Sequence, residues 1–116
     1  YLGLTPADRA ITTLPLSYSF GLSILASHID AGASLVLTRH SLLEREFWTL
    51  VDGAVVTSLS GVPATFELLA RLGLDRRALP SLRMLTQAGG RLRDDLIRRF
   101  DALARARGWT FWVMYG

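Results

Sequence analysis

Residues 82–92 read Leu-Arg-Met-Leu-Thr-Gln-Ala-Gly-Gly-Arg-Leu. The first half of this stretch is typical of a buried strand, and its second half is a glycine turn that leads into a segment of helical period at 93–107. A second apolar strand at 109–114 runs just as abruptly into Tyr115-Gly116. Two strands that each deliver a glycine turn are typical of parallel sheets, whose ligands bind at the carboxyl ends of the strands.

The rest of the chain repeats this alternation of short strands and helical segments. Apolar runs predict strands at 10–14, 34–38, 54–59, 83–86 and 109–114, and helical spacing predicts helices at 22–30, 43–51, 63–72 and 93–107. Such alternation is the pattern of βα units. We therefore expect an α/β fold in which a mostly parallel five-stranded sheet is flanked by helices, with residues 1–116 forming one unit.

Glycine, proline and charge placement support these helix bounds. Gly32 and Gly73 follow predicted helices as C-caps, and Pro63 suits a first helical turn. Acidic residues come early and arginines late in segment 93–107, which matches the helix dipole. Apolar side chains that recur at helical spacing in 43–51 should pack on the sheet: Leu43, Phe47, Leu50 and Val51.

Composition excludes several classes of protein. Half of the 116 residues are hydrophobic, which excludes a disordered chain, and the length suffices for one core. The apolar stretch 14–37 is interrupted by Pro15, His28 and Asp30, so we expect buried structure there and no membrane span. The absence of cysteine excludes disulfides and thiolate chemistry. We expect a cytoplasmic protein.

The charge is basic but dispersed. All thirteen basic residues are arginine, and the net charge is +3. The arginines alternate with acids along helices, as in Glu44-Arg45-Glu46, which favours a solvated surface over a nucleic-acid interface. We expect no nucleic-acid partner. Because the segment contains no lysine, any lysine chemistry must come from elsewhere in the protein.

Four loops should meet at one edge of the sheet, those after strands 10–14, 54–59, 83–86 and 109–114. Glycines there would let a flat ring or a phosphate approach the backbone, and Tyr115 could stack on a base or donate its hydroxyl. In the alternative interpretation, Gly89-Gly90 is only a tight strand-to-helix turn. His28 is better explained as a locally bonded helix residue than as a catalyst.

Four segments resemble, in order, those of the adenylate-forming enzymes, a family that includes acyl-CoA synthetases, luciferases and peptide-synthetase adenylation domains. Residues 14–21 are similar to the family's Leu-Pro-Leu-Phe-His-x-x-Gly segment, and Val62-Pro63 is similar to its Val-Pro helix start. Residues 88–92 are similar to its Gly-Gly-Ala-Pro-Leu turn, and Tyr115-Gly116 to the opening of Tyr-Gly-x-Thr-Glu. The matches span nearly the whole chain.

The resemblance implies two groups of site residues. The nucleotide-binding group is Ala88, Gly89, Gly90, Arg91, Tyr115 and Gly116. The substrate-pocket group is Tyr18, Phe20 and Ile24. Tyr18 stands where many members have a histidine and cannot act as a cation at neutral pH. Arg91 stands where the family has proline and could instead be a solvated residue, while Phe20 and Ile24 could equally be core. No catalytic residue or metal ligand is nominated.

The resemblance also implies the chemistry of a larger parent protein. The parent would use ATP and Mg²⁺ to activate a carboxylic acid and pass it to a thiol, with CoA expected as the acceptor. The family's phosphate loop with its lysine should precede Tyr1, and its magnesium-binding Glu should follow Gly116.

We therefore expect residues 1–116 to be an internal fragment of the N-terminal AMP-binding domain. As a fragment it should be inactive without the rest of the enzyme. Two alternatives remain open: a non-catalytic α/β binding module of the doubly wound type, and a truncated remnant that binds nothing.

Overall fold

The computed structural model describes residues 5–11, 26–36, 38, 42–88 and 90–113. They form a five-stranded sheet in the order β2-β1-β3-β4-β5, in which every paired strand is parallel. The predicted α/β class is confirmed. The strands are β1 (Arg9–Ile11), β2 (Ser34–Val36), β3 (Ser58–Gly61), β4 (Met84–Gln87) and β5 (Thr110–Val113). The helices are α2 (Arg45–Gly53), α3 (Pro63–Leu72), the 3₁₀ turn η1 (Leu74–Arg76) and α4 (Asp94–Arg107), and residues 26–30 are also helical.

The strand register shows which side chains lie on each face of the sheet. Leu59, Leu85 and Phe111 pair across β3, β4 and β5, and all three pack in the main core. Phe66 of α3 and Phe100 of α4 cover this face, with their rings edge to face and 5.1 Å between centroids. Since side chains alternate along a strand, the neighbouring row of β3, β4 and β5 lies on the opposite face.

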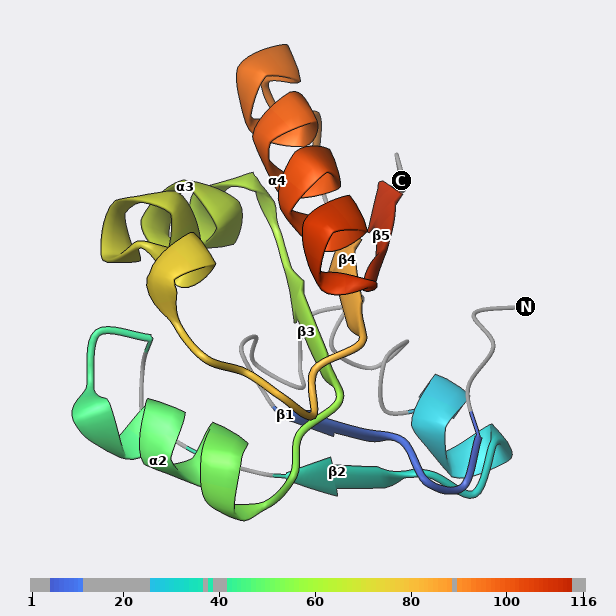
Figure 1. Cartoon of the computed structure of the whole chain (residues 1–116). Coiled ribbons are helices and arrows are strands. Elements are labelled where there is room, and N and C mark those ends of the chain that lie inside the picture. The colour runs from blue at the N-terminus through green and yellow to red at the C-terminus, as the bar shows by residue number, and fades with distance from the viewer. Residues whose placement is uncertain (1–4, 12–25, 37, 39–41, 89, 114–116) are drawn as a thin grey trace.

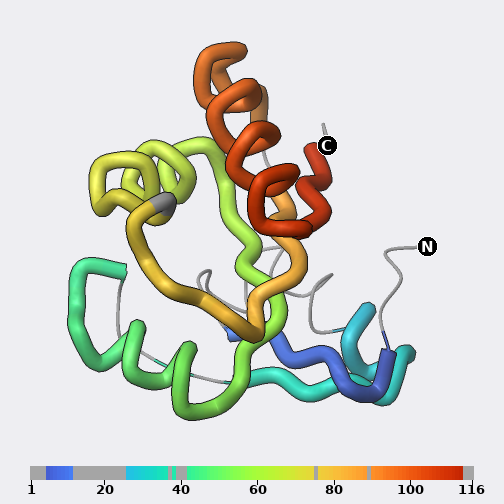
Figure 2. The backbone as a smooth tube through the Cα atoms, viewed as in Figure 1, coloured from blue at the N-terminus to red at the C-terminus, as the bar shows by residue number. Residues whose placement is uncertain are grey.

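The handedness of the parallel crossovers explains which face of the sheet each helix covers. The connection from β1 to β2 runs toward one edge of the sheet, and the later connections run toward the other, so right-handed crossovers place their helices on opposite faces. Figure 1 shows α2 and α3 on one side of the sheet and the helical residues 26–30 on the other. The chain path in Figure 2 shows the repeated return from β3 through α3 to β4 and through α4 to β5.

Several predicted helix ends are confirmed. Pro63 is the first residue of α3, Gly73 caps it with φ +72°, and Gly32 follows the helical residues 26–30 with φ +71°. Helix α4 carries acids in its first turn and Arg105 and Arg107 in its last. These charges complement the helix dipole. The 3₁₀ turn η1 was not predicted.

The predicted strand at 54–59 is wrong in its bounds. Helix α2 continues to Gly53, and the N–H groups of Ala54 and Val56 donate to its last carbonyls, of Leu50 and Val51, over 2.9 and 3.1 Å. Val55 has a φ of +56°, a left-handed conformation that ends a helix and does not extend a strand. Helix capping thus delays β3 to Ser58, and β3 then continues to Gly61.

The predicted apolar face of α2 is wrong at one position. Leu43 precedes the helix and is 69% exposed, whereas Phe47 and Val51 are buried as predicted. Trp48 is buried in place of Leu43, and its indole N–H donates to the Leu42 carbonyl over 2.9 Å. Of the other predicted bounds, residues 12–14, 22–25, 37 and 114 lie outside the described residues.

Candidate functional site

The carboxyl ends of the strands share one edge of the sheet because all strand pairs are parallel. At this carboxyl edge, β3 ends at Gly61, β4 at Gln87 and β5 at Val113. The Ala88 N–H donates to the Gly61 carbonyl over 3.1 Å, which extends the pairing of β3 and β4 by one bond. The glycine turn after β4 therefore begins firmly attached to the neighbouring strand.

Gly61 allows the α3 helix to start close against the strand. A Cβ atom at this position would lie 2.4 Å from Thr65 Cγ2, so no larger residue fits without movement. The Thr65 hydroxyl accepts a hydrogen bond from the Val62 N–H at 3.3 Å, which satisfies one of the free donors at the start of α3. The close approach of β3 and α3 thus depends on glycine at position 61.

Gly90 gives the turn a conformation that other residues rarely adopt. Its φ is +144°, and a Cβ atom there would approach Pro63 Cγ to 3.4 Å. The turn after β4 therefore lies against the first residue of α3. Two loops predicted to meet at this edge are in contact.

Gln87 lies beneath this turn and holds it from inside. The side chain is fully buried, and its Nε2 donates to the Ala88 carbonyl over 3.1 Å and to the Gly90 carbonyl over 2.9 Å. Gln87 was not among the predicted site residues. A signal was present, because a glutamine ends an otherwise apolar strand immediately before a Gly-Gly pair.

Three buried polar atoms near the carboxyl edge have no hydrogen-bond partner among the described residues. They are Gln87 Oε1, Thr86 Oγ1 and Trp112 Nε1. Thr86 and Trp112 are register partners across β4 and β5, so both atoms come from the same row of the sheet. Because buried polar groups are rarely left without partners, this region is suited to a polar ligand or a further segment of protein.

Arg91 lies at the exposed rim of the turn. Its guanidinium pairs with Asp94 over 3.4 Å, and both side chains are largely exposed, at 76% and 66%. The next residue, Leu92, is buried in the core and fixes the chain after the turn. Arg91 is thus free to reorient toward a ligand at little cost, since exposed ion pairs of this kind contribute little stability.

The structure brings three of the predicted nucleotide-binding residues together, namely Ala88, Gly90 and Arg91, at the carboxyl edge. The other three, Gly89, Tyr115 and Gly116, lie outside the described residues. The predicted substrate-pocket residues Tyr18, Phe20 and Ile24 also lie outside them.

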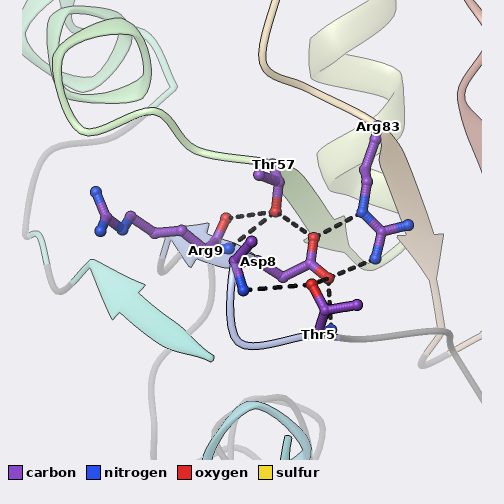
Figure 3. A network of polar contacts seen from close by, with 6 residues as sticks. Thr5, Asp8, Arg9, Thr57 and Arg83 are labelled. Atoms are coloured by element: carbon purple, nitrogen blue, oxygen red, sulfur yellow. Dashed lines mark hydrogen bonds and ion pairs between the residues drawn. The ribbon is translucent and has the colours of Figure 1, made fainter. Parts of the chain in front are cut away.

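A second polar cluster lies at the opposite, amino edge of the sheet (Figure 3). The buried carboxylate of Asp8 accepts hydrogen bonds from Arg83 Nε at 2.6 Å and from the Thr57 hydroxyl at 2.9 Å. It also accepts one from the Thr5 N–H at 2.8 Å. The Arg83 guanidinium is the main reason that the pKa of Asp8 lies well below its usual range, and the Asp8 carboxylate raises the pKa of Arg83.

This amino-edge cluster connects three strands. Asp8, Thr57 and Arg83 immediately precede β1, β3 and β4. The Thr57 hydroxyl also accepts the Arg9 N–H over 2.9 Å. The contacts of this cluster join the starts of β1, β3 and β4 at the edge opposite to the glycine turn.

Two further observations concern metals and membranes. In the described parts of the chain, three or more His, Asp or Glu side chains nowhere gather as metal ligands would. Across the same residues, no helix combines the length and the apolar character needed to cross a bilayer.

Comparison with known proteins gives one family. The model of the family described as "AMP-binding enzyme" matches residues 1–116. No curated protein sequence matches the chain significantly.

Solved structures that resemble the chain include CmiS6, at 26% identity and a TM-score of 0.81, and VinN in complex with L-aspartate, at 26% and 0.75. Another is the O-succinylbenzoate coenzyme A synthetase MenE from Bacillus subtilis, in complex with ATP and magnesium ion, at 28% and 0.76. These alignments cover 98%, 99% and 99% of this chain, but only 28%, 28% and 23% of the respective solved chains.

Proposed function

The chain belongs to the AMP-binding enzyme family. We propose that it is an internal part of the N-terminal nucleotide-binding domain of an AMP-forming ligase. The observation that carries the proposal is that Ala88 and Gly90 follow β4 at the carboxyl edge of a parallel sheet. Ligands of open parallel α/β sheets bind at this edge. The likeness to MenE, whose structure contains ATP and magnesium ion, supports the same function.

The proposed reaction has two steps. A carboxylate oxygen of the acid attacks the α-phosphorus of ATP, and the bond to the bridging oxygen breaks, so that pyrophosphate leaves with the electron pair. A thiolate sulfur then attacks the acyl carbon of the adenylate, and AMP leaves as the C–O bond breaks. The products are a thioester, AMP and pyrophosphate. The acceptor thiol proposed here is CoA, and a cytoplasmic location is part of the proposal.

The described residues fit a nucleotide at the turn. Gly90 keeps the backbone accessible, and two buried groups on neighbouring strands, the Thr86 hydroxyl and the Trp112 indole N–H, have no hydrogen-bond partner among the described residues. Ala88, Gly89 and Gly90 would lie against the adenine, Arg91 at its rim, and Tyr115 would stack on it. Tyr18, Phe20 and Ile24 would line the pocket for the acid.

The family resemblance assigns Mg²⁺ to a glutamate that should follow Gly116, and the described residues contain no group of three or more His, Asp or Glu side chains that could hold it. Its chemistry, when it is bound, is to neutralise charge on the phosphates. We also propose that residues 1–116 are inactive without the rest of the enzyme.

The test is pyrophosphate release by the full-length protein. Purified enzyme is incubated with ATP, Mg²⁺ and a panel of aromatic, fatty and amino acids, each with and without CoA. We expect pyrophosphate release that depends on one class of acid, and formation of a thioester when CoA is added. Failure to release pyrophosphate with every acid would favour the non-catalytic α/β module.

A further inference from the structure

We propose that Gln87 is a positioning residue: it holds the carbonyls of Ala88 and Gly90, and so orients the backbone after β4 to receive the nucleotide. The inference rests on the proposed function, because it assigns a task to a residue behind the proposed nucleotide site. The residue itself would not touch ATP. Its side chain acts on the backbone that does.

The hydrogen bonds of Gln87 enclose the turn. A side-chain amide nitrogen has two hydrogens, and Gln87 Nε2 donates to two carbonyls, those of Ala88 and Gly90. Both acceptors lie within three residues of Gln87 in sequence, so the side chain closes a small ring around the turn. Because Gln87 is fully buried, water does not compete for these bonds.

The same bonds set the direction of a backbone donor. In a trans peptide the C=O and N–H groups point in opposite directions. The Gly90 carbonyl is directed at Gln87, so the N–H of Arg91, in the same peptide plane, is directed away from it. That N–H makes no hydrogen bond with the described residues and is available to a ligand at the carboxyl edge.

The turn needs such support because its own backbone does not provide it. Gly90 has a φ of +144°, in a region that glycine adopts readily and other residues rarely adopt. Glycine loses more conformational freedom on ordering than other residues. A turn that Gln87 has already ordered avoids that loss when the nucleotide binds.

If position 87 only had to fill the core, an apolar side chain would be more stable there than glutamine. Gln87 Oε1 is buried and has no hydrogen-bond partner among the described residues, and such an atom is costly in a protein interior. A methionine of similar length would avoid this cost but could not bind the two carbonyls. The glutamine therefore fits a role in shaping the turn better than a role in filling the core.

The experiment compares two variants of the full-length protein with a matched control. Gln87→Met removes both donated bonds, and Gln87→Glu keeps the shape but turns an ionised carboxylate toward two carbonyl oxygens. The control, Ser58→Ala, removes a buried hydroxyl at the start of β3, away from the carboxyl edge. Thermal unfolding and the KM values for ATP and for the acid, from pyrophosphate release, are measured for each.

In the expected result, Gln87→Met raises the KM for ATP by about tenfold or more, since small displacements in a site are costly. The KM for the acid and the unfolding temperature change little, and Ser58→Ala changes neither KM. The KM for ATP of Gln87→Glu improves as the pH is lowered, because a protonated carboxyl can donate one of the two lost bonds. The wild-type enzyme and Ser58→Ala show no matching improvement.

Other results overturn the inference. If the Gln87 variants of an active enzyme change both KM values equally, or neither, Gln87 does not position the nucleotide turn. If both Gln87 variants fail to fold, its role is stability. A wild-type enzyme that releases no pyrophosphate overturns the proposed function, and this inference with it, which distinguishes the two failures.

Discussion

Asp8 and Arg83 lie 75 positions apart in the sequence, yet Arg83 Nε donates to the buried Asp8 carboxylate over 2.6 Å. The pair connects the start of β1 with the start of β4, and Thr57 joins it from the start of β3. Because a carboxylate that loses its partner in a protein interior is costly, this contact has measurable consequences for stability.

The first prediction concerns Asp8→Ala in the full-length protein. We expect a loss of about 2 kcal/mol in the free energy of unfolding, less than for a fully buried pair because the Arg83 side chain is 40% exposed. The matched control is Asp101→Ala, which removes an exposed carboxylate paired with Arg105 and should cost less than about 0.5 kcal/mol. Equal losses in denaturant unfolding would contradict the assignment.

The second prediction concerns pH. Since the folded-state pKa of Asp8 lies below its unfolded value near 3.9, the ion pair contributes its full stability above about pH 5 and loses it as the pH falls toward the folded pKa. The difference in unfolding temperature between wild type and Asp8→Asn should therefore narrow between about pH 5 and pH 3. A difference that stays constant over this interval would show that Asp8 has an ordinary pKa.

The third prediction concerns the close approach of β3 and α3. Gly61→Ala should destabilise the protein by roughly 1–3 kcal/mol, because its Cβ would overlap Thr65. The second substitution Thr65→Gly should recover part of the loss by opening that space. Gly53→Ala is the matched control, since nothing lies within 4 Å of a Cβ at the end of α2, and it should be neutral or slightly stabilising. Thermal unfolding of the three variants checks the order.

The fourth prediction separates the two interpretations of Arg91. If its guanidinium contacts the nucleotide at the rim, Arg91→Ala should raise the KM for ATP about fivefold, equivalent to about 1 kcal/mol. The unfolding temperature should not change, because the Arg91 side chain is 76% exposed. An unchanged KM would mean that Arg91 is only a solvated residue.

The fold class could be predicted because the alternation of strands and helices depends on local sequence patterns. The strands at 83–86 and 109–114 and the helix at 93–107 were confirmed within a residue or two, since apolar runs, glycines and charge order mark them directly. The strand at 54–59 was misplaced because the apolar run Ala54-Val55-Val56 looks extended in sequence. In the fold it completes the cap of α2, with Val55 in a left-handed conformation.

The position of the candidate site at the carboxyl edge could be predicted from the sequence, but only some of its residues could. Ala88 and Gly90 are visible in sequence because glycine marks an unusual backbone. Gln87 was missed because its role depends on two carbonyls beyond the strand, which no periodicity reveals. The Asp8–Arg83 pair was missed for a related reason, because it forms only after three strands are aligned.

We propose that the chain belongs to an enzyme that splits ATP between the α- and β-phosphates to activate an acid. The most direct measurement is ³¹P NMR of the full-length protein with ATP, Mg²⁺, an acid substrate and CoA. We expect AMP and pyrophosphate to appear together, and only when the acid is present. Formation of ADP and inorganic phosphate, or ATP breakdown that does not depend on the acid, would contradict it.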